Sequence, residues 1–199
     1  MTDAQPSLVT WHASQVTPED RQQLLRHKPI TLWLTGLSAS GKSTLAFALE
    51  RRLLDEGQLC FVLDGDNVRH GLNSNLGFSA QDRSENIRRV AEVAKLMNDA
   101  GLIVIAAFIS PFTQDRALAR AIIGTELFRE VHISTSLGIC ESRDPKGMYS
   151  KARSGNLANF TGISSPYEPP EQPHLRIDTQ SVNLGAGVDQ LLALINGSR

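Results

Sequence analysis

The chain has 199 residues, of which 41% are hydrophobic and 21% charged, and its formal net charge is −1. This length suits one globular α/β domain, residues 1–199, and the near-zero charge predicts neither nucleic acid nor a membrane as a partner. No stretch approaches the ~20 apolar residues of a membrane span, and the N-terminus has no signal-peptide pattern. We therefore expect a cytoplasmic protein, in which Cys60 and Cys140 are buried thiols.

Residues 1–28 are polar and are expected to form a peripheral extension, with a short helix beginning at Thr17 and Pro18. The apolar run 30–34 then predicts a buried strand. Residues 36–43 fit the phosphate-binding pattern G-x-x-x-x-G-K-[ST], and an apolar-faced helix follows them. Because strand, loop and helix occur in this order, a chance match on a surface loop is the weaker interpretation.

This phosphate-binding loop is expected to bind ATP, because successive backbone N–H groups point at the phosphates from a helix N-terminus. Lys42 supplies a positive charge to the terminal phosphates, and Ser43 offers a hydroxyl to Mg²⁺. The loop residues assigned to ATP are Gly36, Leu37, Ser38, Ala39, Ser40, Gly41, Lys42, Ser43 and Thr44.

Downstream of the loop, apolar runs alternate with helical patterns. Strands are expected at 58–63, 102–109, 128–133 and 175–178, and helices at 79–100, 114–123, 137–141 and 188–195, with a helical turn at 67–72. The nearly continuous apolar run 102–109 is typical of a central parallel strand covered on both faces. Residues 143–173 show no periodicity, and such a long stretch is usually functional or disordered. The alternation predicts a doubly wound parallel sheet of the P-loop NTPase type.

Two carboxylates follow the strand at 58–63. In a doubly wound sheet, ligands bind beyond the carboxyl ends of the strands, and Asp64 and Asp66 lie at the end of a strand that we expect to neighbour the first. The strand at 102–109 ends in Ser110 without an acid. Asp64 and Asp66 are therefore the candidates for metal ligation and base catalysis, with the division between them left open. The alternative is an ordinary turn, since Asp-Gly-Asp-Asn is turn-rich.

A group of arginines follows on or before the helix at 79–100. Arg83 lies near the N-terminus of that helix, where the helix dipole favours an acid, so its position makes more sense if an anion binds there. Arg69 precedes the helix, and guanidinium groups match phosphate and sulfate oxygens with two parallel hydrogen bonds. Arg88 and Arg89 are expected to lie on the solvated helix face.

Several longer motifs resemble the adenylyl-sulfate kinase family. They are Leu63-Asp64-Gly65-Asp66-Asn67-Val68-Arg69-His70-Gly71-Leu72, Leu76-Gly77-Phe78-Ser79, Asp82-Arg83-x-Glu85-Asn86-Ile87-Arg88-Arg89-Val90, Phe108-Ile109-Ser110-Pro111-Phe112, Arg143-Asp144-Pro145-Lys146-Gly147 and Phe160-Thr161-Gly162-Ile163. The resemblance runs in unbroken order from about residue 30 to residue 168. The phosphate-binding loop alone would fit any NTPase, whereas these motifs are far more specific.

The resemblance implies transfer of the ATP γ-phosphoryl group, with Mg²⁺, to the 3′-hydroxyl of adenosine 5′-phosphosulfate. It places Arg143 with the ATP site and implies a homodimer, while association with a sulfurylase is left open. It further implies a mobile lid at about 146–170 that closes over both nucleotides and excludes water. The residues that it assigns to the acceptor are Asp64, Arg69, Phe78, Arg83, Asn86, Ile109, Lys146, Leu157 and Phe160.

Within this assignment, Phe78 and Phe160 would clamp the adenine, since both lie in polar loops where a core role is harder to argue. The serine that matches Ser110 has been assigned in this family as a phosphorylated intermediate. A serine nucleophile needs an adjacent base, so we favour direct in-line transfer and keep Ser110 as a catalytic candidate beside Lys42, Asp64 and Asp66.

Two positions depart from the family pattern. Ala39 replaces a common glycine in the loop, which should matter little if its φ is negative. Gly138 lies inside an expected helix and should weaken it by ~1 kcal/mol.

Two other functions stay open. Another small-molecule kinase, acting on a sugar or a nucleoside monophosphate, would not need two aromatic residues flanking arginines. A nucleotide-dependent switch is the second alternative, and the sequence has no Asn-Lys-x-Asp guanine-reading motif.

Overall fold

The computed structural model describes residues 9–197 and contains a parallel sheet with strand order β2-β3-β1-β4-β5. Its strands are β1 (Ile30–Thr35), β2 (Cys60–Asp64), β3 (Ile103–Ala107), β4 (Phe128–Ile133) and β5 (Leu175–Ile177). Every pairing between neighbouring strands is parallel, with Leu32 of β1 opposite Ile105 of β3. The predicted doubly wound parallel sheet is confirmed.

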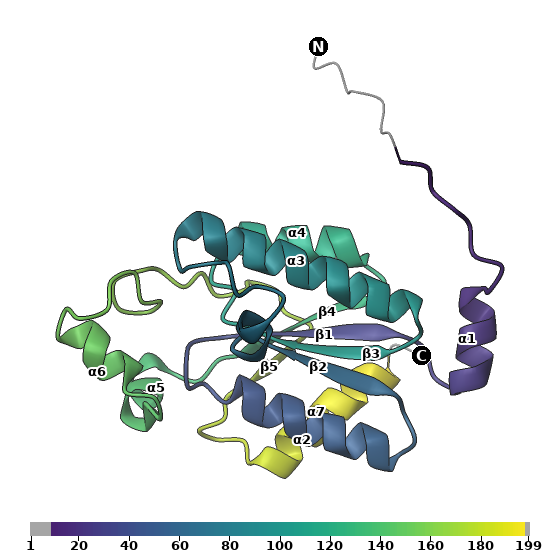
Figure 1. Cartoon of the computed structure of the whole chain (residues 1–199). Helices are drawn as coiled ribbons and strands as arrows, with labels where there is room; N and C mark the ends of the chain where they lie inside the picture. The colour runs from purple at the N-terminus through teal and green to yellow at the C-terminus, as the bar shows by residue number, and fades with distance from the viewer. Residues whose placement is uncertain (1–8, 198–199) are drawn as a thin grey trace.

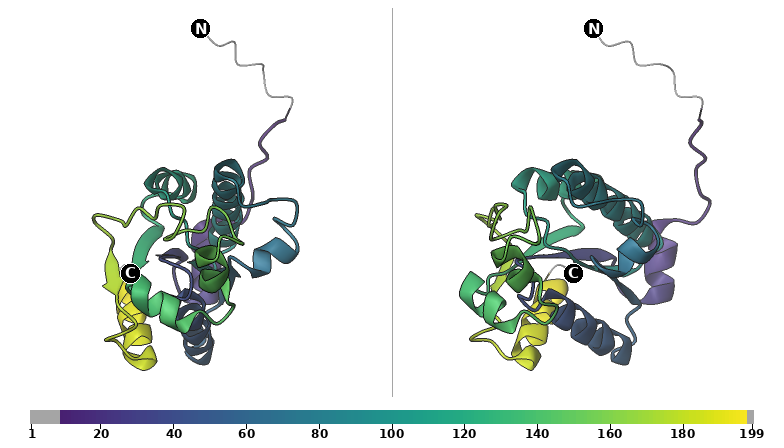
Figure 2. Two further views of the ribbon diagram at one scale, coloured as in Figure 1. Left: turned by 90° about the vertical axis from the view of Figure 1, so that its left-hand side faces the viewer. Right: turned by 60° about the vertical axis from the view of Figure 1, so that its left-hand side comes forward.

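Helices cover both faces of this sheet (Figure 1). The helical elements are α1 (Pro18–Leu25), α2 (Lys42–Asp55), η1 (Asn67–His70), α3 (Ala80–Asp99), α4 (Thr113–Ile123), α5 (Leu137–Arg143), α6 (Met148–Arg153) and α7 (Leu184–Asn196). α3 and α4 lie on one face, α2 and α7 on the other, and α5 and α6 lie beyond the end of the sheet opposite α1 (Figures 1 and 2). No helix among residues 9–197 is long and apolar enough to cross a membrane.

Alternate residues of β1 supply two separate hydrophobic cores. Leu32 and Leu34 pack against α2 and α7, whereas Trp33 packs against α3 and α4, and all six residues of β1 are buried. This burial of both faces explains why the strand reads as a continuous apolar run rather than as an alternating one. The middle strand of the sheet thus leads directly into the phosphate-binding loop.

The expected place of β2 beside β1 is wrong, because β3 lies between them. All five residues of β3 are buried, whereas Phe61 of β2 is exposed, so β3 suits an interior position and β2 the edge. The longer apolar run at 102–109 does indicate an inner strand, but it does not indicate that this strand lies between β1 and β2.

The stretch at 143–173 also differs from expectation, since it contains the six-residue helix α6. Tyr149 and Ala152 of α6 are buried in a third, smaller apolar cluster with Cys140 of α5. Elsewhere the expected elements are present, including the cap at Thr17, where α1 begins with Pro18. Residues 1–8 of the expected N-terminal extension lie outside the described residues.

Candidate active site

The phosphate-binding loop joins β1 to α2. Gly36 has φ +153°, and a side chain there would overlap the carbonyl oxygen of Ile133, so only glycine fits. Gly41 has φ +102° and precedes the first residue of α2. That residue, Lys42, is buried, and its Nζ donates hydrogen bonds to the carbonyl oxygens of Gly36 (2.9 Å) and Leu37 (2.6 Å). Burial lowers the pKa of Lys42 to about 8.

Ala39 does not have the negative φ on which its expected harmlessness depended. Its φ is +58°, in the left-handed region that costs a residue with a Cβ roughly 1–2 kcal/mol. The carbonyl oxygen of Ala39 accepts a hydrogen bond from Arg143 Nη1 (3.4 Å), and Arg143 is itself held by Thr179 through Oγ1 (2.8 Å) and the carbonyl oxygen (3.0 Å). Contacts from distant segments therefore set the shape of the loop.

Ser43 and Asp64 form the part of the site that suits a metal ion. Ser43 Oγ lies 2.7 Å from Asp64 Oδ2, although their segments flank non-neighbouring strands. Mg²⁺ prefers oxygen ligands and, with nucleotide phosphates, uses only one or two protein groups, so this hydroxyl and carboxylate fit a nucleotide-bound Mg²⁺. Asp64 Oδ1 also accepts hydrogen bonds from the N–H groups of Asp66 (3.0 Å) and Asn67 (3.4 Å), so the same residue also shapes the turn.

Asp66 has a different environment from Asp64. It is largely exposed and forms an ion pair with Lys146, which lies 80 residues further along the chain. The two carboxylates therefore differ in both burial and partner. Asp64 is buried and is bonded to Ser43, whereas Asp66 is exposed and pairs with Lys146.

Two arginines and an exposed aromatic ring lie on the other side of the site. The guanidinium of Arg69 is 4.4 Å from the centre of the Phe78 ring, and Phe78 is 62% exposed. Arg83 donates to the carbonyl oxygen of Phe78 (3.0 Å), to Thr161 Oγ1 (2.5 Å) and to the carbonyl oxygen of Asn159. Arg83 thus connects the start of α3 to the loop after α6.

Asn86 is buried in the next turn of α3. Its Oδ1 accepts a hydrogen bond from Asn73 Nδ2 (3.0 Å). The side-chain Nδ2 of Asn86 is therefore the group that can donate to a ligand. Arg88 lies on the exposed helix face as expected and pairs with Glu85. Arg89 also pairs with Glu85, but it is half-buried and donates to the Leu72 carbonyl oxygen and to Asn75 Oδ1, so it is not simply on the solvated face.

The interpretation of Phe160 as a loop residue without a core role is wrong. Phe160 is buried, and its ring contacts Tyr149 of α6 edge-on, with centroids 4.9 Å apart. Tyr149 was not anticipated as a site residue; its hydroxyl donates to the carbonyl oxygen of Ser38 (3.0 Å) and so connects α6 to the phosphate-binding loop. Its aromatic side chain, among the basic residues 146–153, is the one sequence signal that could have indicated it.

Ser110 is buried at the end of β3 and has φ +37°. Its Oγ accepts a hydrogen bond from Trp33 Nε1 (3.2 Å) and lies 3.5 Å from the carbonyl oxygen of Phe108. Within the described part of the chain, the hydrogen-bond partners of this hydroxyl thus include no carboxylate or imidazole that could act as a base.

A cavity of about 990 Å³ unites these groups. Its lining includes every residue proposed from the sequence except three residues of the phosphate-binding loop: Gly36, Leu37 and Ser40. The lining also includes a segment before and at the start of α7 that the sequence did not indicate: Thr179, Val182, Asn183 and Leu184. Nothing in that segment distinguishes it from an ordinary loop before an amphipathic helix.

Comparison with known proteins identifies close relatives. The family described as adenylylsulphate kinase matches residues 28–178. The adenylyl-sulfate kinase of Pseudomonas entomophila is 58% identical over 187 residues, covering 92% of this chain and 90% of the relative, and that of Staphylococcus epidermidis is 54% identical over 184 residues, covering 92% of both. The structure of the Mycobacterium tuberculosis APS kinase in complex with AMPPNP and APS is 46% identical, with a TM-score of 0.82 over 85% of this chain and 99% of that one.

Proposed function

The chain belongs to the adenylylsulphate kinase family, and we propose that it transfers the γ-phosphoryl group of ATP to the 3′-hydroxyl of adenosine 5′-phosphosulfate. The products are ADP and 3′-phosphoadenosine 5′-phosphosulfate. One observation carries this proposal: a single cavity contains a phosphate-binding loop on one side and two arginines with aromatic rings on the other. That is the composition needed to hold two nucleotides with their reacting groups facing each other.

On the donor side, the loop N–H groups and Lys42 bind the ATP phosphates, and Arg143 lines the same end of the cavity. Ser43 and Asp64 are the residues that would hold Mg²⁺, which neutralises charge on the phosphates of the bound nucleotide. We assign Asp64 to the metal because its carboxylate adjoins Ser43. Asp66, paired with Lys146, then helps to hold the start of the proposed lid.

On the acceptor side, Arg69 and Arg83 bind the phosphosulfate, and Asn86 offers amide N–H groups to the ribose. Phe78 and Phe160 bracket the adenine, while Ile109, Lys146 and Leu157 complete the wall of the cavity. We propose direct in-line transfer, because the Ser110 hydroxyl is bonded to an indole N–H rather than to a base.

We propose the same organisation for the whole chain as the sequence suggests: one kinase domain with a peripheral extension at 1–28 and a lid at about 146–170. We also propose a homodimer and a cytoplasmic location. The related APS kinase from Thiobacillus denitrificans is described as hexameric and is 34% identical, with a TM-score of 0.65 over 86% of this chain and 29% of that one. Light scattering on the purified chain would distinguish a monomer, a dimer and a larger assembly.

The deciding assay follows ADP formation with ATP and Mg²⁺ in the presence of adenosine 5′-phosphosulfate, AMP, a panel of sugars, or no acceptor. We expect fast turnover with adenosine 5′-phosphosulfate alone. A preference for a sugar or for AMP would support another small-molecule kinase instead. Equal turnover without any acceptor would support a nucleotide-dependent switch.

A further inference from the structure

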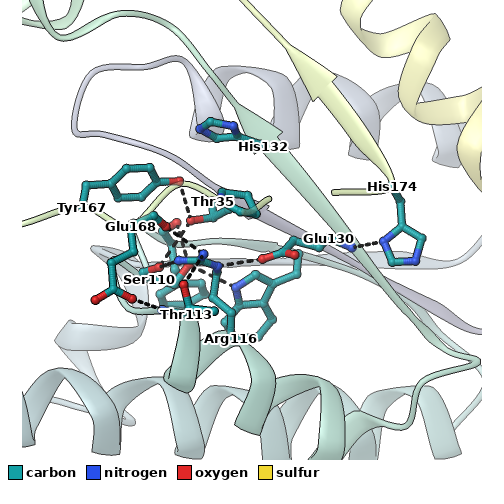
Figure 3. Close-up of polar contacts among 12 residues, drawn as sticks. Thr35, Ser110, Thr113, Arg116, Glu130, His132, Tyr167, Glu168 and His174 are labelled. Carbon is teal, nitrogen blue, oxygen red and sulfur yellow. Dashed lines mark hydrogen bonds and ion pairs between the residues drawn. The ribbon is translucent and has the colours of Figure 1, made fainter. Parts of the chain in front are cut away.

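A polar cluster built around the buried Thr35 and Arg116 lies behind the cavity, where the C-terminal end of the proposed lid meets the sheet (Figure 3). We call this cluster the lid seat and define it as Thr35, Arg116, Glu130, Tyr167 and Glu168. None of the five residues lines the cavity, and the proposed mechanism uses none of them.

Arg116 of α4 is the centre of the lid seat. Its side chain is only 3% exposed, and its Nε pairs with Glu130 Oε1 at 2.7 Å. Nη1 donates to the carbonyl oxygen of Ser110 and Nη2 to that of Glu168, each at 2.8 Å. A buried guanidinium is costly unless its N–H donors are satisfied. Here two of these donors bind backbone carbonyl oxygens of two segments that are 58 residues apart along the chain.

Tyr167 makes the second connection. The hydroxyl of Thr35, which directly precedes the phosphate-binding loop, donates to the carbonyl oxygen of Ile109 at 2.7 Å. Since that proton is committed, the Tyr167 hydroxyl is the donor in its 3.0 Å contact with Thr35 Oγ1. Burial raises the pKa of Tyr167 to about 12, which keeps the phenol protonated and able to donate.

Glu168 completes the attachment. Its carboxylate accepts the N–H of Thr113 at the start of α4 (2.7 Å), and its own N–H donates to the carbonyl oxygen of Pro111 (2.8 Å). Residues 167 and 168 are thereby fixed to the turn at 109–111 and to the residue before the phosphate-binding loop. These contacts fix the proposed lid at its C-terminal end.

We propose that Arg116 and Tyr167 are positioning residues, which fasten the C-terminal end of the lid to the turn at Ile109 and Ser110 and thereby set the acceptor wall of the cavity. Ser110 has a left-handed φ of +37°, and such a conformation persists only where its surroundings determine it. Two hydrogen bonds hold Ser110 in this conformation. Arg116 donates to the Ser110 carbonyl oxygen, and Thr35 donates to the carbonyl oxygen of Ile109. This inference rests on the proposed kinase function.

Loosening the lid seat should affect acceptor binding and the exclusion of water more than ATP binding. A displaced wall at 109–110 misplaces the acceptor, and a lid with a free C-terminal end admits water to the γ-phosphate. The distinctive result is uncoupling, in which more ADP forms than phosphorylated acceptor. A merely structural role would lower activity without changing this ratio.

The test compares Tyr167→Phe and Arg116→Lys with Arg120→Gln, an exposed arginine one turn further along α4. Tyr167→Phe keeps the buried ion pair and removes only the hydroxyl, so it should fold normally. We expect about a tenfold rise in acceptor KM, an unchanged ATP KM, and excess ADP. Arg116→Lys keeps the charge but replaces three separate nitrogen donors with one ammonium, which cannot reach Glu130 and the carbonyl oxygens of Ser110 and Glu168 together. Its loss in kcat/KM should therefore be larger, about a hundredfold. Arg120→Gln should match the wild type.

A second measurement does not depend on the acceptor. Trypsin cleavage of the full chain at Lys151 and Arg153, in the lid, is followed with and without ATP and Mg²⁺. We expect ATP to protect the wild type and Arg120→Gln several-fold more than Tyr167→Phe. If the wild type fails to use adenosine 5′-phosphosulfate but this difference persists, the proposed function fails and the lid seat stands. Equal protection, with wild-type coupling in both folded seat variants, would overturn the lid seat.

Discussion

Acidification from pH 7 to pH 5 should destabilise the fold chiefly through His132 of β4. His174, whose pKa is also lowered by burial and by Arg129, acts in the same direction. The side chain of His132 is 6% exposed, and its ring stacks on that of Tyr167 at 5.9 Å between centroids. Burial, reinforced by the cations of Arg176 and Arg116, lowers the pKa of His132 to about 4. Arg176 Nη1 lies 3.1 Å from His132 Nδ1, so Nδ1 accepts and the ring is neutral.

The sign and size of the effect follow from proton linkage. Between pH 6.5 and pH 4 the unfolded chain binds a proton at this histidine and the folded chain does not, so the free energy of unfolding falls as the pH falls. A pKa of about 4 in the folded state and of about 6.5 in the unfolded state gives a loss of about 2 kcal/mol at pH 5, and at most about 3 kcal/mol at lower pH.

Urea unfolding at pH 7 and pH 5 measures this loss. His132→Asn keeps an acceptor for Arg176 and removes the titrating ring, so its free energy of unfolding should change by about 2 kcal/mol less than that of the wild type over this pH range. His70→Asn, at an exposed position, is the control and should behave as the wild type. If His132→Asn lost as much stability as the wild type between the two pH values, the reasoning would be refuted.

Three substitutions test the site itself. Lys42→Ala should lower kcat at least about a thousandfold without loss of stability to urea, because it removes a buried ammonium that we propose binds phosphate. Near-normal turnover would exclude Lys42 from the mechanism. Arg83→Ala should raise the acceptor KM at least tenfold, or by about 1.4 kcal/mol, while Arg88→Ala on the exposed helix face should not; equal KM values would refute the role of Arg83. Ala39→Gly should raise the free energy of unfolding by up to about 1 kcal/mol, because the relief of the left-handed strain exceeds the added unfolded-state entropy; a loss of stability to urea would contradict the strain.

The elements with strong periodicity were predictable from the sequence. α3 buries Ile87, Val90 and Ala94 at helical spacing, and the expected strand at 128–133 coincides with β4. The apolar run at 102–109 did indicate an inner strand, but the place of β3 between β1 and β2 was not predicted, because strands that follow each other in the chain are usually neighbours. α6 was missed for a related reason: its burial of Tyr149 depends on a cluster contributed by other segments, and six residues carry too little periodicity.

The residues of the candidate site likewise fall into those that the sequence indicated and those that it did not. The phosphate-binding loop and Asp64 were found because each lies in a short motif at the end of a strand. Thr179 and Tyr149 were not found, because their contacts with Arg143 and with the Ser38 carbonyl oxygen connect segments that no local pattern relates. Phe160 lines the cavity, but the reason given for its selection was wrong, since it is also part of a core.

Residues with strained backbone conformations line the cavity, and arginine side chains bind their carbonyl oxygens. Among residues 9–197, the non-glycine residues with positive φ are Arg26, Ala39, Ser110 and Asn159. Arg26 ends α1, where a left-handed cap is ordinary, and the other three line the cavity.

Each of these three residues has its carbonyl oxygen bound by a guanidinium: Ala39 by Arg143 and Asn159 by Arg83, both from distant segments, and Ser110 by Arg116, six residues further along the chain. Their conformations are unfavourable locally and are kept by contacts 6 to 104 residues away along the chain. A planar guanidinium holds such a carbonyl oxygen and a second acceptor through separate nitrogens in a fixed fork, a geometry that the single ammonium of lysine does not reproduce at these positions. The cavity wall is therefore specified by the tertiary placement of three arginines, which is why the sequence of the wall alone does not predict its shape.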